Sequence, residues 1–268
     1  MDSPPERPDT LQSLERGLAV LQVFSSEYPQ LTLSDVARLA GTTRATARRI
    51  LHTLASLGYV RVDGRSFSLT ARVLSLGWAY LSSLNLWDIA QPFMEELVAK
   101  TNESCSASTL DLPDIVYVAR VPTRRIMTVG LSVGSRLPAH ATSMGRVLLA
   151  ELPEEELEAF LASGSFDART DRTQVAPDEL RTAIRRVREQ GWAMVDQELE
   201  LGLRSIAAPV RGADGRAIAA LNLAAAAPRV GLDELRGHFL PLLLETAEQV
   251  STAFARSGRV TTVRGTTR

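Results

Sequence analysis

The stretch from Leu31 to Leu69, LTLSDVARLAGTTRATARRILHTLASLGYVRVDGRSFSL, constrains the fold more than any other part of the chain. Thr32 and Asp35 have the spacing of a capping box, in which a hydroxyl and a carboxylate satisfy free amides of the first helical turn. Gly41 follows where a helix commonly ends on a left-handed residue. The sequence therefore predicts a short helix that stops at a tight glycine turn.

A second helix is predicted from about Thr43 to Leu57. Its apolar residues recur at the spacing of a packed face, formed by Ala47, Ile50, Leu51, Leu54 and Leu57. The opposite side carries small and cationic side chains, which would let the helix enter a DNA major groove and place guanidinium groups near bases or phosphates. The DNA-binding residues predicted on this helix are Thr43, Arg44, Ala45, Thr46, Arg48, Arg49 and His52.

The segments YVRV and FSL flank Asp63-Gly64 and read as two strands of a hairpin. Together with the two helices they predict a winged helix-turn-helix, with Arg61 and Arg65 as further DNA-binding residues. Between Val36 and Arg72 there are seven arginines and one acid, a balance of +6 in a chain whose net charge is −1. Such a local cluster favours binding to a polyanion through counterion release. The alternative is that these arginines only form a solvated face.

The length of 268 residues predicts about two domains. We expect a DNA-binding domain over residues 11–70, a linker helix over 71–87 and an effector-binding domain over 88–256. In the first domain, a helix that packs behind the other two is predicted from a repeat of apolar residues, Leu11, Leu14, Leu18, Leu21 and Phe24.

The linker helix carries a stripe of large apolar residues, Leu74, Trp78, Leu81 and Leu84. Such a stripe needs a partner. One candidate is the same helix of a second chain, which would place two recognition helices on two DNA half-sites. The other is the C-terminal domain of the same chain.

The second domain combines strand and helix patterns. The predicted strands are CSASTL, IVYVARV, IMTVGLSV, WAMVDQELE, SIAAPV and AIAALNLAA. The predicted helices are FMEELVAK, PEEELEAFLA, PDELRTAIRRVREQ and a stretch from Leu232 to Ala255 that Pro241 should restart or kink. The fold class expected is α+β, with one mixed, mostly antiparallel sheet.

Several classes of protein are disfavoured by the composition. The start, MDSPPERPDT, lacks the features of a signal peptide, and no apolar run is long enough to span a bilayer, so we expect a cytoplasmic protein. The single Cys105 should be a small buried side chain. With three histidines far apart in the sequence, we expect no metal and no cofactor.

Catalysis is also not expected. Asp196, Glu198 and Glu200 alternate as on one strand face, which suggests either paired catalytic carboxylates or, more simply, the wet side of a sheet. No nucleophile elbow, phosphate loop or histidine base accompanies them. Arg136 and Arg204 are candidates for binding a carboxylate, since guanidinium binds it bidentately. The alternative is that either arginine bridges the dimer or caps a helix. His140 would either assist them or hold its loop in place.

Four motifs in order resemble the IclR-type transcriptional regulators: SLERGLAVLQVF, TLSDVARLAGTTRATARRILHTLASLGYV, LPAHATSMGRVLLA and GLRSIAAPV. The segment SVGSRLPAHATSMGRVLLA is most similar to the branch that controls aromatic-acid catabolism through protocatechuate and β-ketoadipate. The resemblance implies a winged helix-turn-helix that binds operator DNA and a GAF-like domain that binds a small organic acid. It also implies a homodimer that often pairs into a tetramer.

The resemblance also implies an effector pocket. Carried over by motif, its residues are Ser143, Met144, Asp196, Leu203, Ser205, Asn222 and Ala224. Ser143 would begin a helix whose free amides can hold a carboxylate, while Met144 and Leu203 would form apolar walls. Relatives often carry hydroxyl residues at the positions of Asn222 and Ala224. An alternative function is a metabolite-binding protein or enzyme whose helix-turn-helix serves protein contact.

Overall fold

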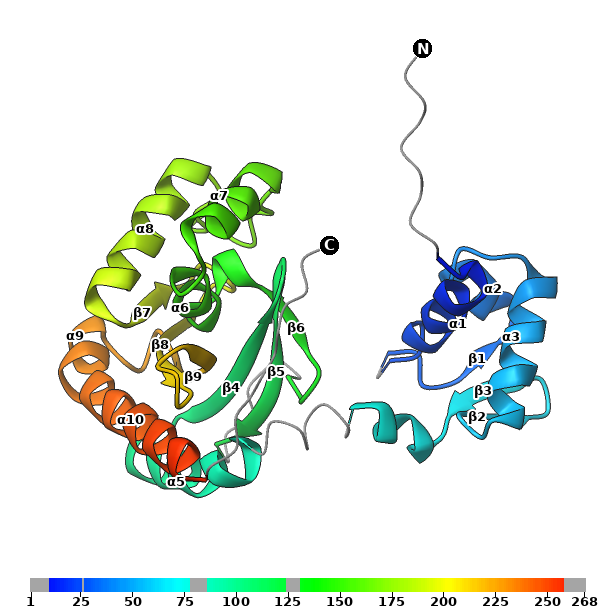
Figure 1. The fold of residues 1–268 in the computed structure, drawn as a ribbon, viewed down its shortest axis with the longest axis horizontal. Helices are drawn as coiled ribbons and strands as arrows, with labels where there is room; N and C mark the ends of the chain where they lie inside the picture. Colours follow the sequence, from blue (N-terminus) through cyan, green and yellow to red (C-terminus); the bar gives the residue numbers. More distant parts are fainter. Residues whose placement is uncertain (1–9, 26, 78–85, 124–130, 258–268) are drawn as a thin grey trace, which may run out of the picture. The chain divides into compact units, whose positions relative to one another are not determined.

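The computed structural model describes residues 10–25, 27–77, 86–123 and 131–257. The chain divides into two compact units, Met1–Ser82 and Ser83–Arg268 (Figure 1). Each unit has its own sheet and its own buried apolar cluster. No helix among the described residues is long and apolar enough to cross a membrane.

The first unit is a winged helix-turn-helix. Its elements are α1 (Gln12–Gln22), β1 (Leu31–Thr32), α2 (Leu33–Leu39), α3 (Arg44–Ser56), β2 (Val60–Asp63) and β3 (Ser66–Leu69). The three strands form an antiparallel sheet in the order β1-β3-β2. The predicted capping box begins α2: the Thr32 hydroxyl accepts from the Asp35 amide, and the Asp35 carboxylate accepts from the Thr32 amide. Gly41 adopts the left-handed conformation that separates α2 from α3.

Two predictions about packing in this unit need correction. Leu57 is 51% exposed, because α3 ends at Ser56 and the chain turns away there. The predicted apolar stripe of the first helix faces the core only in part: Leu11 and Leu14 are 70% and 59% exposed, while Leu21 packs against the buried cluster. The side of α1 that packs inward carries Val20, and Phe24 follows it into the same cluster.

The region after the wing differs from the predicted linker helix. Ala71–Val73 forms a 3-10 turn (η1), and residues 74–77 are helical. The predicted stripe positions Trp78, Leu81 and Leu84 lie outside the described residues. Helix α5 then runs from Leu86 to Thr101 and includes Pro92, although the linker helix was predicted to end before this proline. The side chain of Pro92 is exposed. Proline has no N–H, so the backbone carbonyl four residues before Pro92 receives no helical hydrogen bond and can bind water instead.

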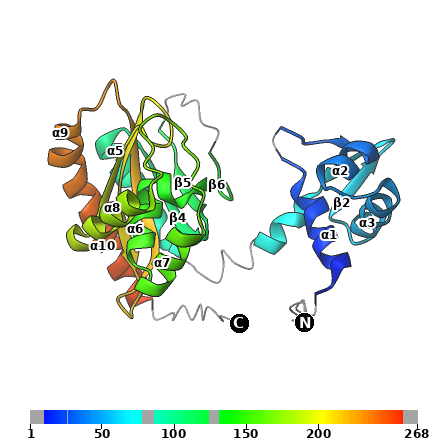
Figure 2. The same ribbon diagram turned by 90° about the horizontal axis from the view of Figure 1, so that it is seen from above.

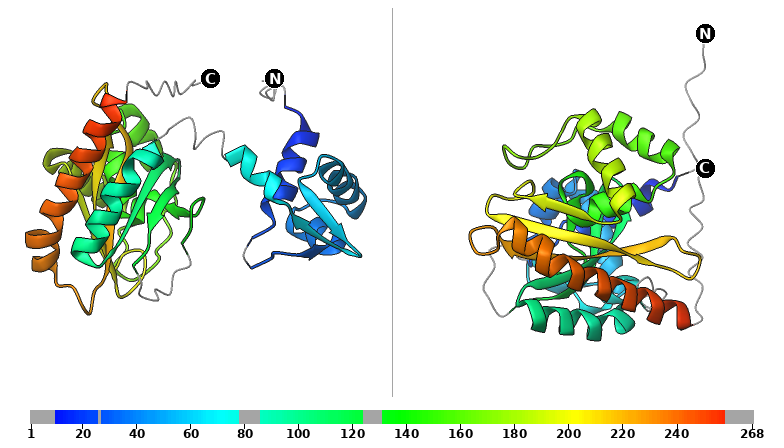
Figure 3. Two further views of the ribbon diagram at one scale, coloured as in Figure 1. Left: turned by 90° about the horizontal axis from the view of Figure 1, so that it is seen from below. Right: turned by 90° about the vertical axis from the view of Figure 1, so that its left-hand side faces the viewer.

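The second unit is built on a six-stranded antiparallel sheet in the order β6-β5-β4-β9-β8-β7. The strands are β4 (Ser104–Asp111), β5 (Asp114–Val121), β6 (Arg136–Pro138), β7 (Ala193–Asp196), β8 (Leu203–Arg211) and β9 (Ala217–Ala226). Helices α5 and α10 (Leu240–Arg256) lie side by side on one face (Figure 2). The other face carries η2 (Ala139–Ala141), α6 (Ser143–Ala150), α7 (Glu154–Ser163) and α8 (Pro177–Gln190) (Figure 3).

Two strand predictions in this unit are corrected. Residues 126–130 of IMTVGLSV lie outside the described residues, and 131–133 are not a strand but lead into a turn at Gly134, whose φ is 89°. The segment WAMVDQELE stays extended only as far as Asp196, since the next residue, Gln197, has a φ of 62° and starts the loop between β7 and β8.

The C-terminal helical stretch is interrupted close to Pro241, as predicted. Helix α9 (Leu232–Glu234) passes into a π-helical turn, η3 (Leu235–Phe239), and Pro241 stands in the first turn of α10.

Candidate functional site

The exposed face of α3 is the first candidate site. Thr43 caps the helix: its hydroxyl accepts from the Thr46 amide at 3.2 Å. The side chains of Arg44, Arg48 and Arg49 are exposed, as are those of Ala45 and His52, while Thr46 is half-buried. The face is therefore cationic and free of bulky apolar groups, as a helix that enters the major groove requires.

The hairpin adds Arg61 on β2 and Arg65 beside the turn at Gly64, and both are exposed. Within the described part of the first unit, neither these two arginines nor the three of α3 form an ion pair; only Arg38 does, with Asp35. No described acidic residue neutralises their positive charge, which can therefore interact with phosphates.

The second candidate site is a small, partly enclosed cavity of the second unit, of about 30 Å³. We call it the central cavity. It lies between the sheet and the start of α6. Its lining residues are Tyr117, Arg120, Leu131, Ala141, Thr142, Ser143, Val195, Leu199, Leu203, Ser205, Asn222 and Ala224.

Five of the seven predicted pocket residues meet at this cavity: Ser143, Leu203, Ser205, Asn222 and Ala224. The Ser143 and Ser205 hydroxyls are 2.8 Å apart and join the first turn of α6 to β8. The register of the sheet explains the grouping, because Ala224 of β9 lies opposite Ser205 of β8.

The structure does not bring Met144 and Asp196 to the lining of the central cavity. Met144 is buried in the apolar cluster beneath α6, where its sulfur accepts from the Ser108 hydroxyl at 3.3 Å. Side chains alternate along a strand, so Val195 lines the cavity while Asp196 lines a separate surface groove beside α8. There the Asp196 carboxylate is 2.9 Å from Nε of Arg204 and 3.3 Å from Nη1 of Arg172.

Arg136, Arg204 and His140, which the sequence offered as candidates for effector binding, also do not line the central cavity. Arg136 of β6 forms ion pairs with Asp111 at the end of β4 and Asp114 at the start of β5. Arg204 pairs with Asp196 and donates to the Val230 carbonyl. The His140 ring packs 5.1 Å from the Phe166 ring, and its Nε2 lies 3.2 Å from the Asp167 carbonyl oxygen, so the histidine holds its loop. Burial is the main reason that the pKa of His140 is below its usual value.

Arg120, the charged residue of the cavity lining, is absent from the sequence predictions. It is on β5, and its Nη1 lies 3.3 Å from the Ser106 hydroxyl. None of the described acidic residues forms an ion pair with it. The signal was present in the strand segment IVYVARV, where a single arginine interrupts an apolar run of small and β-branched residues.

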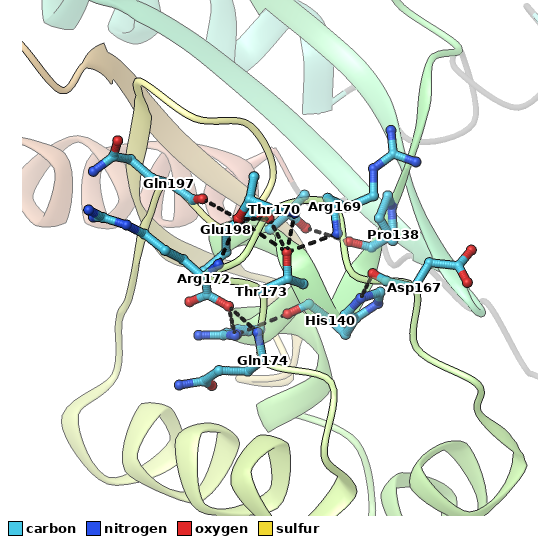
Figure 4. A network of polar contacts seen from close by, with 12 residues as sticks. Pro138, His140, Asp167, Arg169, Thr170, Arg172, Thr173, Gln174, Gln197 and Glu198 are labelled. Carbon is cyan, nitrogen blue, oxygen red and sulfur yellow. Dashed lines mark hydrogen bonds and ion pairs between the residues drawn. The ribbon is translucent and has the colours of Figure 1, made fainter.

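The loop from Gln197 to Gly202 closes one side of the cavity with the side chain of Leu199. Hydrogen bonds from the segment 170–174 hold this loop in place (Figure 4). The Thr170 and Thr173 hydroxyls donate to the carbonyls of Gln197 and Glu198 at 2.7 and 2.6 Å. Glu198 itself is buried and pairs with Arg146, so the predicted wet strand face of Asp196, Glu198 and Glu200 is wrong. The reason is that the strand ends before Glu198.

Comparison with known proteins identifies the family to which both domains belong. The helix-turn-helix domain of the IclR family matches residues 13–64, and the family described as the C-terminal domain of bacterial transcriptional regulator IclR matches residues 78–252. The chain belongs to the IclR family of transcriptional regulators. As in the regulators of that family, a DNA-binding helix-turn-helix is joined to an effector-binding domain, and members of the family include regulators of aromatic-acid catabolism.

The similarity to individual IclR relatives covers nearly the whole chain. The chain is 46% identical to the Pca regulon regulatory protein of Pseudomonas putida over 91% of its own length and 84% of the relative's. It is 38% identical to the p-hydroxybenzoate hydroxylase transcriptional activator of Acinetobacter baylyi, over 90% of its own length and 91% of the relative's. An IclR homologue from Microbacterium hydrocarbonoxydans, solved with 4-hydroxybenzoate, superimposes with a TM-score of 0.81 at 25% identity, with 92% and 100% covered.

Proposed function

We propose that the effector of this regulator is a small aromatic or dicarboxylic acid that binds in the central cavity. Ser143, Leu203, Ser205, Asn222 and Ala224 would contact it. The observation that carries this proposal is the charge of the lining: its charged residue is Arg120, and no carboxylate stands among the described lining residues. A cavity with an uncompensated cation favours an anionic ligand. The relatives named for the Pca regulon and for p-hydroxybenzoate metabolism support the aromatic-acid class.

Thermal unfolding with added acids tests this proposal. A ligand that binds only the folded protein raises its melting temperature by mass action. We expect such a rise with at least one of 4-hydroxybenzoate, protocatechuate and β-ketoadipate. If none of the three changes the melting temperature or gives heat in calorimetry, the effector class is wrong, although the family assignment stands.

We propose further that α3 reads operator DNA in the major groove and that the wing contacts the backbone. The residues concerned are those predicted from the sequence: Thr43, Arg44, Ala45, Thr46, Arg48, Arg49, His52, Arg61 and Arg65. The uncompensated arginines described above support this proposal. A gel shift with the DNA upstream of the chain's own gene, titrated with salt and with the acids above, tests both binding and the response to the effector.

A homodimer is also proposed, with a dimer of dimers as the tetrameric form. Leu14 and Leu18 of α1, and Leu11 just before it, are exposed apolar side chains, as are Leu74 and Leu76 after η1. Exposed leucines in such number favour contact with a second copy. Sedimentation velocity would detect the assembly, and a monomer at micromolar concentration would contradict it. As a regulator of bacterial genes, the protein is proposed to act in the cytoplasm, without catalytic activity of its own.

A further inference from the structure

One row of residues crosses the sheet at the polar side of the central cavity. In the register of the strands, Arg120 of β5 lies opposite Ser106 of β4, and Ser106 lies opposite Asn222 of β9. Directly paired residues on neighbouring strands project on the same face of a sheet. The Arg120 guanidinium reaches toward the middle strand, where its Nη1 is 3.3 Å from the Ser106 hydroxyl. It is therefore directed toward the position of Asn222.

Asn222 is oriented by the same row. Its Oδ1 accepts from the backbone amide of Ser106 at 3.1 Å. Because an amide N–H can only donate, the oxygen of the Asn222 side chain must face it, and the Nδ2 group is left as a donor. No described residue accepts a hydrogen bond from Nδ2, although Asn222 is buried and lines the cavity.

The remaining guanidinium donors of Arg120 have no acceptor among the residues that the structure describes. Among the described residues, only the Ser106 hydroxyl accepts from this side chain, and no carboxylate pairs with it. The sequence of the undescribed segment after Thr123, RRIMTVG, contains two further arginines and no acid. Burial raises the pKa of the neighbouring Tyr117 to about 12, so its phenol stays neutral and cannot balance the charge of Arg120.

We propose that Arg120 binds the carboxylate of the effector and that the Nδ2 group of Asn222 donates a second hydrogen bond to it. This inference rests on the proposed function, and it adds to the pocket a residue that the family motifs did not supply. A planar guanidinium and an amide presented by one row of the sheet match the oxygens of a carboxylate. Ser143 and Ser205, which lie at the start of α6 and on β8, then bind a polar group elsewhere on the same molecule.

The chemistry of Asn222 and Ala224 agrees with this assignment. Asn222 offers two N–H donors where a hydroxyl would offer one, and an anion needs donors. Ala224 lines the cavity with a methyl group, which has no polar atom that would need a partner.

Calorimetry on the full-length protein tests the inference. Wild-type protein is titrated with 4-hydroxybenzoate, protocatechuate and β-ketoadipate, and the acid that binds most tightly is used with the variants. We expect Arg120→Met to weaken binding by about tenfold or more, the effect of losing a hydrogen bond to a charged group. Arg120→Lys keeps the charge but not the planar donor pair, so its affinity should lie between the two.

A neutral ligand separates a direct contact from an indirect one. The carboxamide of the same acid, or the diamide if the acid is β-ketoadipate, lacks the negative charge, so Arg120→Met should change its affinity much less than it changes that of the acid. The matched control is Arg136→Met, which removes an arginine that pairs with Asp111 and Asp114 away from the cavity and should leave affinity for the acid within about twofold. The melting temperature of each variant without ligand verifies that it is folded.

Three results would overturn the inference. If wild-type protein binds an acid and folded Arg120→Met binds it equally well, Arg120 is not the anchor and the proposed function stands. If the variant loses the acid and the carboxamide to the same extent, the residue only shapes the cavity. If wild-type protein binds none of the three acids, the proposed effector class and this inference both fail.

Discussion

Arg146 of α6 and Glu198 of the β7–β8 loop form an ion pair inside the second unit. Nη2 of Arg146 lies 2.5 Å from Oε2 of Glu198, and the two side chains are 5% and 10% exposed. The same carboxylate oxygen accepts from the Gln174 amide, and Nε of Arg146 donates to the His140 carbonyl. The pair thus joins the helix that begins at the central cavity to the loop that closes one side of it.

Glu198→Ala should lower the free energy of unfolding by about 3–5 kcal/mol, because it leaves the Arg146 charge buried without a partner. Urea unfolding of the full-length protein measures the change. Glu200→Ala is the matched control, since Glu200 is an exposed acid on the same loop and should cost no more than about 0.5 kcal/mol. Equal effects of the two substitutions would contradict a structural role for the pair.

The features that were predictable from the sequence are those set by neighbouring residues. The capping box of Thr32 and Asp35, the left-handed Gly41 and the exposed arginines of α3 each depend on a few adjacent positions. Local chemistry is enough to place them. The motif resemblance extended this to the cavity, where it located Ser143 on α6 and Ser205 on β8.

The features that were missed depend on which strands become neighbours. Arg136, Arg204 and Arg120 are alike in the sequence. However, the ends of β4 and β5 supply acids to Arg136, and Asp196 of β7 lies opposite Arg204 of β8. Only Arg120 faces the cavity without an acid among the described residues. Glu198 was misread for a similar reason, because the left-handed Gln197 ends the alternation of the strand just before it.

Arg48→Ala and Arg49→Ala should each weaken operator binding by about 1–3 kcal/mol if the guanidinium contacts a base. Where the guanidinium instead neutralises a phosphate, the slope of log affinity against log salt should become shallower by about 0.9 per arginine replaced. Gel shifts at several salt concentrations measure both quantities. Arg216→Ala, an exposed arginine on the turn between β8 and β9, is the control and should leave affinity and slope unchanged. Wild-type binding by both α3 variants would show that another surface reads the DNA.

Gly145→Ala should destabilise the second unit and abolish effector binding. A Cβ at this position would overlap the backbone of Ala139, because α6 packs directly against η2. Backbone cannot move aside as the end of a side chain can, so the start of α6 and Ser143 would be displaced from the cavity. Gly237→Ala is the matched control: it is also a helical glycine, but its added Cβ meets nothing within 4 Å. Thermal unfolding with and without the binding acid would compare the two, and a variant at Gly145 that behaves like the one at Gly237 would contradict the close approach.

The stability of the second unit should fall as the pH drops through the range in which histidine ordinarily titrates. Burial lowers the pKa of His140, and the hydrogen bond to the Asp167 carbonyl raises it by less. The pKa of His140 in the folded protein is therefore below its ordinary value of 6.5. The unfolded chain therefore binds more protons than the folded one between the two pKa values, and stability increases with pH there. The contribution is complete above about pH 6.5 and is lost progressively below it. His140→Gln cannot titrate, so its melting temperature should decrease less than that of the wild type between about pH 8 and pH 5.5. Scanning calorimetry of both proteins at these two pH values measures the difference, and identical decreases would show that His140 does not contribute to the pH dependence.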